Sequence, residues 1–181
     1  MSPEERSNKR LYRKITAFME SGNSFKAFWT LTFDNEHLTK FDGTGKLVRK
    51  FVNKIQGYQK YHGYKNLSYV WKYEEGSESQ RPHFHVMATG YVPLSYCVKA
   101  WGQGFVQMKK ITSQRMAKNY VSKYITKAGQ KPRYWVYGKR FSSSRDIPKA
   151  PKSSWKRIGW SKEPTDLTIE YDHRGQLPKY Y

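Results

Sequence analysis

Cysteine, acidic residues and long apolar runs are scarce in this 181-residue sequence, which has one cysteine and 14 acidic residues. The single cysteine, Cys97, excludes an internal disulfide and any metal site that needs two or more cysteine ligands. The longest apolar runs, such as 27–31, are far too short to span a membrane. The N-terminus is charged from Glu4 onward and shows no apolar signal segment, so we expect a cytoplasmic protein.

Positive charge and aromatic rings are abundant. The 34 lysines and arginines exceed the acidic residues by enough to give a net charge of +20 at pH 7. This imbalance favours a polyanionic partner, with nucleic acid first and an anionic membrane surface second. The 15 Tyr, 9 Phe and 6 Trp argue against disorder, because disordered chains are poor in aromatic residues. Cationic side chains interleaved with flat rings suit single-stranded nucleic acid, whose bases stack and whose phosphates need neutralising.

The spacing of apolar residues predicts alternating helices and strands. Helices are expected over 2–20, 46–61, 95–101 and from a cap at Thr112 or Ser113 to Lys127. Strands are expected over 25–34, 67–74, 82–89 and 105–111. Two of these strands are joined by a short polar loop, which is typical of a β-hairpin. The order predicts an α+β fold, an antiparallel sheet with helices on one side, of ferredoxin-like or RRM-like character.

The amino-acid composition changes after Gly129. We expect a core domain over 1–130 and a basic, aromatic extension over 131–181 that contains five prolines. The extension is predicted to pack on the core or on DNA. A partly disordered tail is the alternative.

His83 and His85 lie in the middle of a predicted strand, where alternation places both side chains on one face. Two adjacent imidazoles can chelate one divalent cation; the other interpretation is two polar residues on a half-exposed sheet face. The preceding strand ends in acidic residues, and the loop folds it back beside the histidines. A carboxylate there would complete a site for Mg²⁺ or Mn²⁺. We favour Glu75 for this position, with Glu74 and Glu78 as alternatives.

Two tyrosines and two lysines share one face of the last predicted helix. Spacings of three and four residues bring together Tyr120, Lys123, Tyr124 and Lys127. A nucleophilic tyrosine needs activation, and an adjacent ammonium favours the phenolate. The alternative is a basic amphipathic helix whose tyrosines pack on the sheet.

Three short motifs occur in order along the chain: FWTLTFD at 28–34, RPHFHV at 81–86 and YVSKYITK at 120–127. This pattern resembles that of the HUH endonucleases, the replication initiators of rolling-circle plasmids and single-stranded DNA phages. The last motif, Tyr-x-x-Lys-Tyr, is most similar to the two-tyrosine initiators. The resemblance covers about residues 28–127 and leaves 1–20 and 131–181 unexplained.

The resemblance implies an HUH endonuclease fold and a role for each motif. His83, His85 and the acidic residue, Glu75 or Glu74, would hold Mn²⁺ or Mg²⁺. Tyr120 would be the nucleophile and Tyr124 the second tyrosine, with Lys123 orienting or neutralising the scissile phosphate. Contacts to DNA are expected from residues in or beside the motifs, namely Thr30, Thr32, Arg81 and Lys127.

The implied activity is site-specific nicking and joining of single-stranded DNA through a covalent 5′-phosphotyrosine. Such an enzyme is a metal-dependent endonuclease and nucleotidyltransferase that acts at a rolling-circle origin. The expected partners are single-stranded origin DNA, in a hairpin, and a host helicase and polymerase in a prokaryotic cytoplasm; no membrane partner is expected. The alternatives are a transposase or relaxase with the same chemistry, and a non-catalytic module that binds single-stranded DNA or RNA.

Overall fold

The computed structural model describes residues 3–76, 80–125, 132–136 and 138–147. All of them belong to one compact unit, Met1–Ala150, and the second unit, Pro151–Tyr181, lies outside the described residues. Most of the predicted extension, 131–181, therefore lies outside the described residues.

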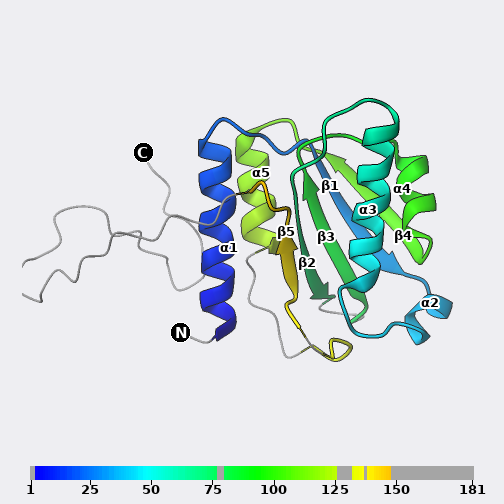
Figure 1. Cartoon of the computed structure of the whole chain (residues 1–181). Helices are drawn as coiled ribbons and strands as arrows, with labels where there is room; N and C mark the ends of the chain where they lie inside the picture. The colour runs from blue at the N-terminus through cyan, green and yellow to red at the C-terminus, as the bar shows by residue number, and fades with distance from the viewer. Residues whose placement is uncertain (1–2, 77–79, 126–131, 137, 148–181) are drawn as a thin grey trace, which may run out of the picture. The chain divides into compact units, whose positions relative to one another are not determined.

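Helices surround a central sheet (Figure 1). Those of the described residues are α1 (Pro3–Glu20), α2 (Asn35–Thr39), α3 (Lys46–Tyr61), α4 (Leu94–Trp101), α5 (Gln114–Tyr120) and the π-helical turn η1 (Val121–Ile125). Helix α5 begins at Ser113, whose side chain accepts a hydrogen bond from the backbone N–H of Met116. The last predicted helix thus changes from α to π geometry directly after Tyr120.

The sheet is antiparallel throughout. The described strands are β1 (Ala27–Phe33), β2 (Tyr69–Glu75), β3 (Pro82–Ala88), β4 (Gly104–Lys110) and β5 (Phe141–Ser143), in the spatial order β4-β1-β3-β2-β5. The first four strands, with α3 and α4 between them, follow the β-α-β-β-α-β order of the ferredoxin-like motif. The predicted α+β class, with its antiparallel sheet, is confirmed.

One face of the sheet is an apolar layer packed against α3 and α4. The inward side of α3, which includes Val48, Phe51 and Ile55, recurs at helical spacing and is buried. It packs on the sheet residues Trp29 and Phe84, which are 1% and 0% exposed. Burial of these large side chains gives this face most of the core.

The opposite face is covered at one end only. There Phe28, Val70 and Met87 are buried beneath apolar residues of α1 and α5, such as Ile15 and Ala117. The prediction that all helices lie on one side is therefore wrong: α3 and α4 cover one face, while α1 and α5 lie on the other (Figure 1). The physical reason is that three apolar side chains on this second face also need removal from water.

Part of the predicted extension joins the core. Strand β5 pairs with β2, so that Phe141 lies opposite Lys72 and Ser143 opposite Val70. Lys14 on α1 donates a hydrogen bond of 2.6 Å to the Ser143 hydroxyl. The unit that contains the sheet consequently continues past the expected boundary at residue 130.

Candidate functional site

Two rows of polar residues cross the second face beyond its apolar end. In the antiparallel register, His83 lies between Thr32 and Glu74 on its neighbouring strands. The next row has His85 between Thr30 and Lys72. Residues directly opposite each other in antiparallel strands point to the same face. These six side chains therefore share one side of the sheet, and the threonines predicted to contact DNA lie directly beside the histidines.

Each histidine is oriented by a threonine. The Oγ1 atom of Thr32 lies 3.0 Å from His83 Nδ1, and that of Thr30 lies 3.3 Å from His85 Nδ1. These contacts engage Nδ1 of each ring and leave Nε2 as the nitrogen for a ligand. Burial lowers the pKa of His83 to about 4, with the nearby His85 and Arg81 acting in the same direction and Glu74 against it. The His83 ring is therefore neutral at pH 7, as metal ligation requires.

The acidic residue beside the histidines is Glu74. Its Oε2 atom lies 2.9 Å from His85 Nε2, and the two side chains are 17% and 5% exposed. Glu75 points to the other face, because neighbouring residues in a strand alternate. There its carboxylate accepts hydrogen bonds from the Tyr73 hydroxyl and from the backbone N–H groups of Arg133 and Tyr134. The structure thus corrects the expected position of Glu75; the alternative Glu74 has the required placement, and Glu78 lies outside the described residues.

The two tyrosines of the last motif lie over the same face. Tyr120 stacks on Phe28 with ring centroids 4.4 Å apart and planes 15° apart. The ring of Tyr124 lies 4.7 Å from that of His85 and 5.2 Å from that of Phe28. Phe28 also stacks on His85 at 5.4 Å. Phe28 therefore contacts both predicted phenols and one of the predicted metal ligands, His85.

Of the two lysines in the same motif, the structure describes only Lys123. Lys123 is exposed, and its ammonium lies 5.2 Å from the centre of the Tyr124 ring. Its charge therefore lies within cation–π distance of the Tyr124 ring. Lys127 lies outside the described residues.

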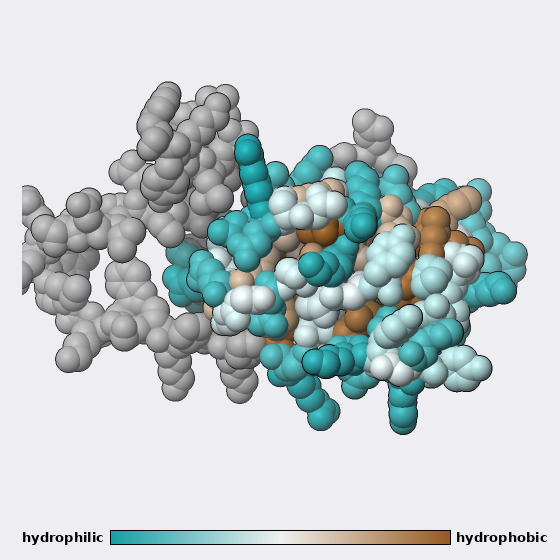
Figure 2. Space-filling model, turned by 90° about the horizontal axis from the view of Figure 1, so that it is seen from above, coloured by the Kyte–Doolittle hydropathy of each residue, from teal (hydrophilic) through white to brown (hydrophobic). Residues whose placement is uncertain are grey.

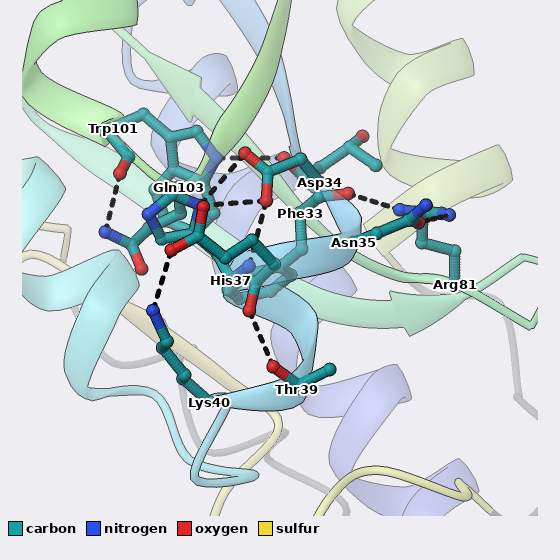
Figure 3. Close-up of polar contacts among 12 residues, drawn as sticks. Phe33, Asp34, Asn35, His37, Thr39, Lys40, Arg81, Trp101 and Gln103 are labelled. Carbon is teal, nitrogen blue, oxygen red and sulfur yellow. Dashed lines mark hydrogen bonds and ion pairs between the residues drawn. The ribbon is translucent and has the colours of Figure 1, made fainter.

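Arg81 contacts the end of β1. Its guanidinium donates hydrogen bonds to the Phe33 carbonyl at 2.7 Å and to Asn35 Oδ1 at 2.6 Å (Figure 3). These contacts fasten the start of β3 to the junction between β1 and α2. The predicted DNA contact of Arg81 is untested, but the side chain already has this structural role.

Contacts of Asp34, Trp101 and Gly104 also hold the end of β1 in place. The Asp34 carboxylate accepts a hydrogen bond from the backbone N–H of His37 and contacts the His37 ring at 2.8 Å (Figure 3). Both contacts lower the pKa of Asp34. Trp101 Nε1 donates to the Thr32 carbonyl at 3.0 Å. At Gly104, where φ is +138°, an added Cβ would collide with the Asp34 nitrogen, so only glycine fits. The row that carries Thr32 is therefore rigidly supported.

Two residues beside the site were missed in the sequence. Lys72 is 4% exposed, although it lies opposite His85, and its ammonium donates to Asn8 Oδ1 on α1 at 3.2 Å. Phe28 links the histidines to the tyrosines. A lysine in an aromatic strand gives no sign of burial under a distant helix. Phe28, by contrast, could have been found, because alternation along β1 places it on the face of Thr30.

The donor set suits a divalent cation. Two imidazoles and one carboxylate are ligands of the kind that Mn²⁺ accepts, and they share one face of adjacent strands. The Glu74 carboxylate is engaged with His85 Nε2, and among the described residues no three His, Cys, Asp or Glu side chains already converge on a common point. Binding would consequently require the carboxylate to turn from His85 Nε2 toward the ion.

A long span of the sequence that contributes to the site has basic residues and no acidic ones. From residue 79 to residue 145 the sequence has no acidic residue, whereas lysines and arginines recur throughout this span. The span includes β3, β4 and α5. Seen from above, much of the described surface is hydrophilic, and apolar residues show between the polar side chains (Figure 2). A polyanion approaching this part of the chain meets little repulsion beyond Glu74.

The structure is thus that of an α+β protein with two histidines, one acidic residue and two tyrosines on one sheet face. The chain belongs to the replication-associated protein (ORF2) family, whose model matches residues 26–129, more than half of the chain. A role in DNA replication, in a phage or plasmid context, follows from this membership. Neither the curated proteins nor the solved structures give a match. No helix in the described part of the chain is long and apolar enough to cross a bilayer.

Proposed function

We propose that this protein is a metal-dependent endonuclease that nicks and rejoins single-stranded DNA at a rolling-circle replication origin. The observation that carries the proposal is that His85, Tyr120 and Tyr124 pack around Phe28, on the same sheet face as His83. Membership of a replication-associated protein family supports a role at a replication origin. A binding module alone would have no use for paired phenols beside paired imidazoles.

The residues that would hold the metal are His83, His85 and Glu74. A bound Mn²⁺ or Mg²⁺ would polarise the scissile phosphate and offset the charge that develops on it. The threonine contacts at Nδ1 fix both imidazole rings, which is how ligating histidines are commonly oriented. The proposal therefore has threonine-oriented imidazoles as ligands, with the Glu74 carboxylate turning from His85 Nε2 toward the ion.

The residue proposed to attack phosphorus is Tyr120. Its phenolic oxygen would form a bond to phosphorus while the bond from phosphorus to the 3′ oxygen breaks, and the released 3′ oxygen would take up a proton. The product is a 5′-phosphotyrosine and a free 3′-hydroxyl. Lys123 would stabilise the phenolate form as the phenol loses its proton. Phosphodiester energy is kept in the new linkage, so no nucleotide hydrolysis is needed.

Tyr124 is proposed as the second nucleophile. Its ring lies 6.0 Å from that of Tyr120 and is itself packed against His85. After one tyrosine has been linked to DNA, the other could attack a regenerated origin and free a new 3′-hydroxyl there. That hydroxyl would attack the first phosphotyrosine, which joins the strand ends and releases the first tyrosine with a proton. The π-helical turn that begins after Tyr120 sets the relative position of the two rings, and such turns are frequent at functional sites.

The proposed partners follow from the substrate. The protein would bind single-stranded origin DNA, presented in a hairpin, and the 3′-hydroxyl that it releases would be extended by a host polymerase. A host helicase would supply the unwound strand. The net charge of +20 favours such a polyanionic substrate.

The test is a covalent-trapping experiment. The full-length protein is incubated with Mn²⁺ and a library of random single-stranded 40-mers labelled at the 3′ end, since a 5′-phosphotyrosine retains the 3′ fragment. We expect a labelled protein band that survives denaturation, is absent in EDTA, and is lost in the Tyr120→Phe/Tyr124→Phe double variant. Sequencing the trapped strands would give the preferred site.

Two results would contradict the proposal. Retention of the adduct in the double variant would assign the chemistry to another residue. Tight binding of the library without any adduct in Mn²⁺ or Mg²⁺ would favour a non-catalytic single-strand-binding module.

A further inference from the structure

The edge strand β4 presents an uncovered stripe on the face that carries the proposed site. β4 is the outermost strand next to β1 (Figure 1). Its alternate residues Phe105, Gln107 and Lys109 are all exposed, whereas Val106 and Met108 pack toward the α3 and α4 side. Phe105 is 68% exposed and is the only phenylalanine among the large exposed hydrophobic residues of the described chain. Its ring is therefore accessible to a ligand at this edge of the sheet.

The register aligns this stripe with the site row by row. Phe105 lies opposite Thr32, which lies opposite His83, and Gln107 and Thr30 lie in the row of His85. Lys109 lies opposite Phe28, on which Tyr120 stacks. Neighbouring strands are about 4.8 Å apart, so Phe105 is about 10 Å from the strand of the histidines. A short stretch of one DNA strand can reach both.

The chemistry of the stripe matches single-stranded DNA. An aromatic ring offers a stacking surface to a base, an amide can bond to base edges, and an ammonium neutralises a phosphate. No acidic residue occurs in β4 itself or anywhere from 79 to 145, which favours a polyanionic ligand. We infer that the β4 stripe, defined as Phe105, Gln107 and Lys109, binds the DNA strand beside the cleavage site, with one base stacked on Phe105.

This inference rests on the proposed function for the identity of the ligand, but it concerns binding and not cleavage. It assigns Phe105 as a positioning residue: the stacked base would set which phosphate lies over His83. The abundance of exposed tyrosines elsewhere provides a matched control. Tyr61, at the end of α3, is 87% exposed and belongs to the helix that covers the opposite face.

The test measures affinity for a fluorescein-labelled dT12 oligonucleotide by anisotropy in EDTA, so that no cleavage occurs. Phe105→Ala should weaken binding between about 5-fold and 100-fold, the loss typical of one stacked base. Phe105→Trp should bind within about twofold of the wild type, because a larger aromatic face is kept. Tyr61→Ala should also bind within about twofold of the wild type, because its ring is placed away from the stripe.

A second probe separates stacking from other effects. On a strand of the same length made of abasic sites, Phe105→Ala and the wild type should bind equally, since no base is present to stack. An affinity of Phe105→Ala for dT12 within twofold of the wild type would overturn the inference. So would an altered oligomeric state in sedimentation with unchanged dT12 affinity, because a second copy of the chain would then occupy the edge.

The two proposals can fail separately. If Phe105→Ala binds dT12 normally and the protein still forms the covalent adduct, the stacking inference alone is wrong. If Phe105→Ala loses affinity but the wild type forms no adduct, the stripe stands and the nicking function is wrong.

Discussion

The two faces of the sheet are built from alternate residues of the same strands, yet one is apolar along its length and the other carries a group of polar side chains. Along β3, Phe84 and Val86 are fully buried against α3 and α4, while His83 and His85 point to the other side. One face removes large apolar side chains from water and supplies stability. The other holds imidazoles, a carboxylate and a buried ammonium, which are paired with one another or with neighbouring polar side chains.

The second face is itself divided between support and chemistry. Near Phe28 it is covered by α1 and α5, and near Thr32 it is left to polar side chains. The covering helices pack on the apolar end, and the π-helical turn after α5 brings Tyr124 against His85. Residues of the apolar core and residues of the candidate site thus alternate along each strand. On the second face they lie only a few residues apart, so substitutions of close neighbours can compare the two groups.

The largest expected effect is that of His83→Ala on nicking. Loss of one of three ligands should lower the rate of metal-dependent adduct formation by at least about 100-fold. The side chain is only partly buried, so the thermal unfolding midpoint should hardly change. The measurement is the initial rate of labelled adduct at saturating Mn²⁺; a rate within threefold of the wild type would remove His83 from the site.

The adjacent substitution Phe84→Ala should lower the stability of the fold, which His83→Ala should leave nearly unchanged. Phe84 is 0% exposed and contacts the rings of Trp71, Tyr73 and Trp101. Truncation in such a core should cost about 3–5 kcal/mol of unfolding free energy. Urea denaturation measures this loss, and a change below about 1 kcal/mol would show that the face is not the tightly packed core described here.

Glu74 and Glu75 offer a comparison within one pair of neighbours. Glu74→Gln should lower adduct formation by about 10-fold to 100-fold at limiting Mn²⁺, because a metal ligand loses its charge. Glu75→Gln should leave the chemistry unchanged and cost about 1 kcal/mol of stability, since its carboxylate binds backbone N–H groups of residues 133 and 134. Equal effects of the two substitutions on the rate would contradict the assignment of faces.

The smallest expected effect concerns salt dependence. Lys109→Gln removes one phosphate contact on the β4 stripe and should reduce the slope of log affinity against log salt by about 0.7 for a single strand. Lys99→Gln, on the exposed side of α4, is the matched control and should leave the slope unchanged. A titration of dT12 binding between low and moderate salt measures both slopes. Equal slopes for the two variants would argue against a phosphate on Lys109.

Most of the regular elements could be predicted from the sequence. The helix over 46–61 is found where its apolar spacing predicts, and the capping serine before α5 is Ser113. Helix α2 and strand β5 were missed, because five and three residues carry too little periodicity to be recognised. The position of α1 on the second face was not predicted either, since an amphipathic stripe gives no information on which face it covers.

The site was predictable where alternation is strict and not where a strand ends. His83 and His85 lie in mid-strand, so their shared face followed from their spacing. Glu74 and Glu75 lie at the last two positions of β2, where the continuation of the pairing decides the face. The register continues to the pair Glu75–Pro82, which assigns Glu74 to the histidines. The burial of Lys72 could not be predicted, because it depends on the position of Asn8 on α1 in the folded chain.

The most direct measurement of the central claim, one shared face for ligands and nucleophiles, is to map the trapped nucleotide by mass spectrometry. Trypsin cleaves after Lys118, Lys123 and Lys127, so Tyr120 and Tyr124 fall in the separate peptides 119–123 and 124–127. The account predicts a Mn²⁺-dependent nucleotide mass on the first peptide, moving to the second in Tyr120→Phe. A nucleotide attached anywhere else in the chain, or an adduct that forms equally in EDTA, would contradict it.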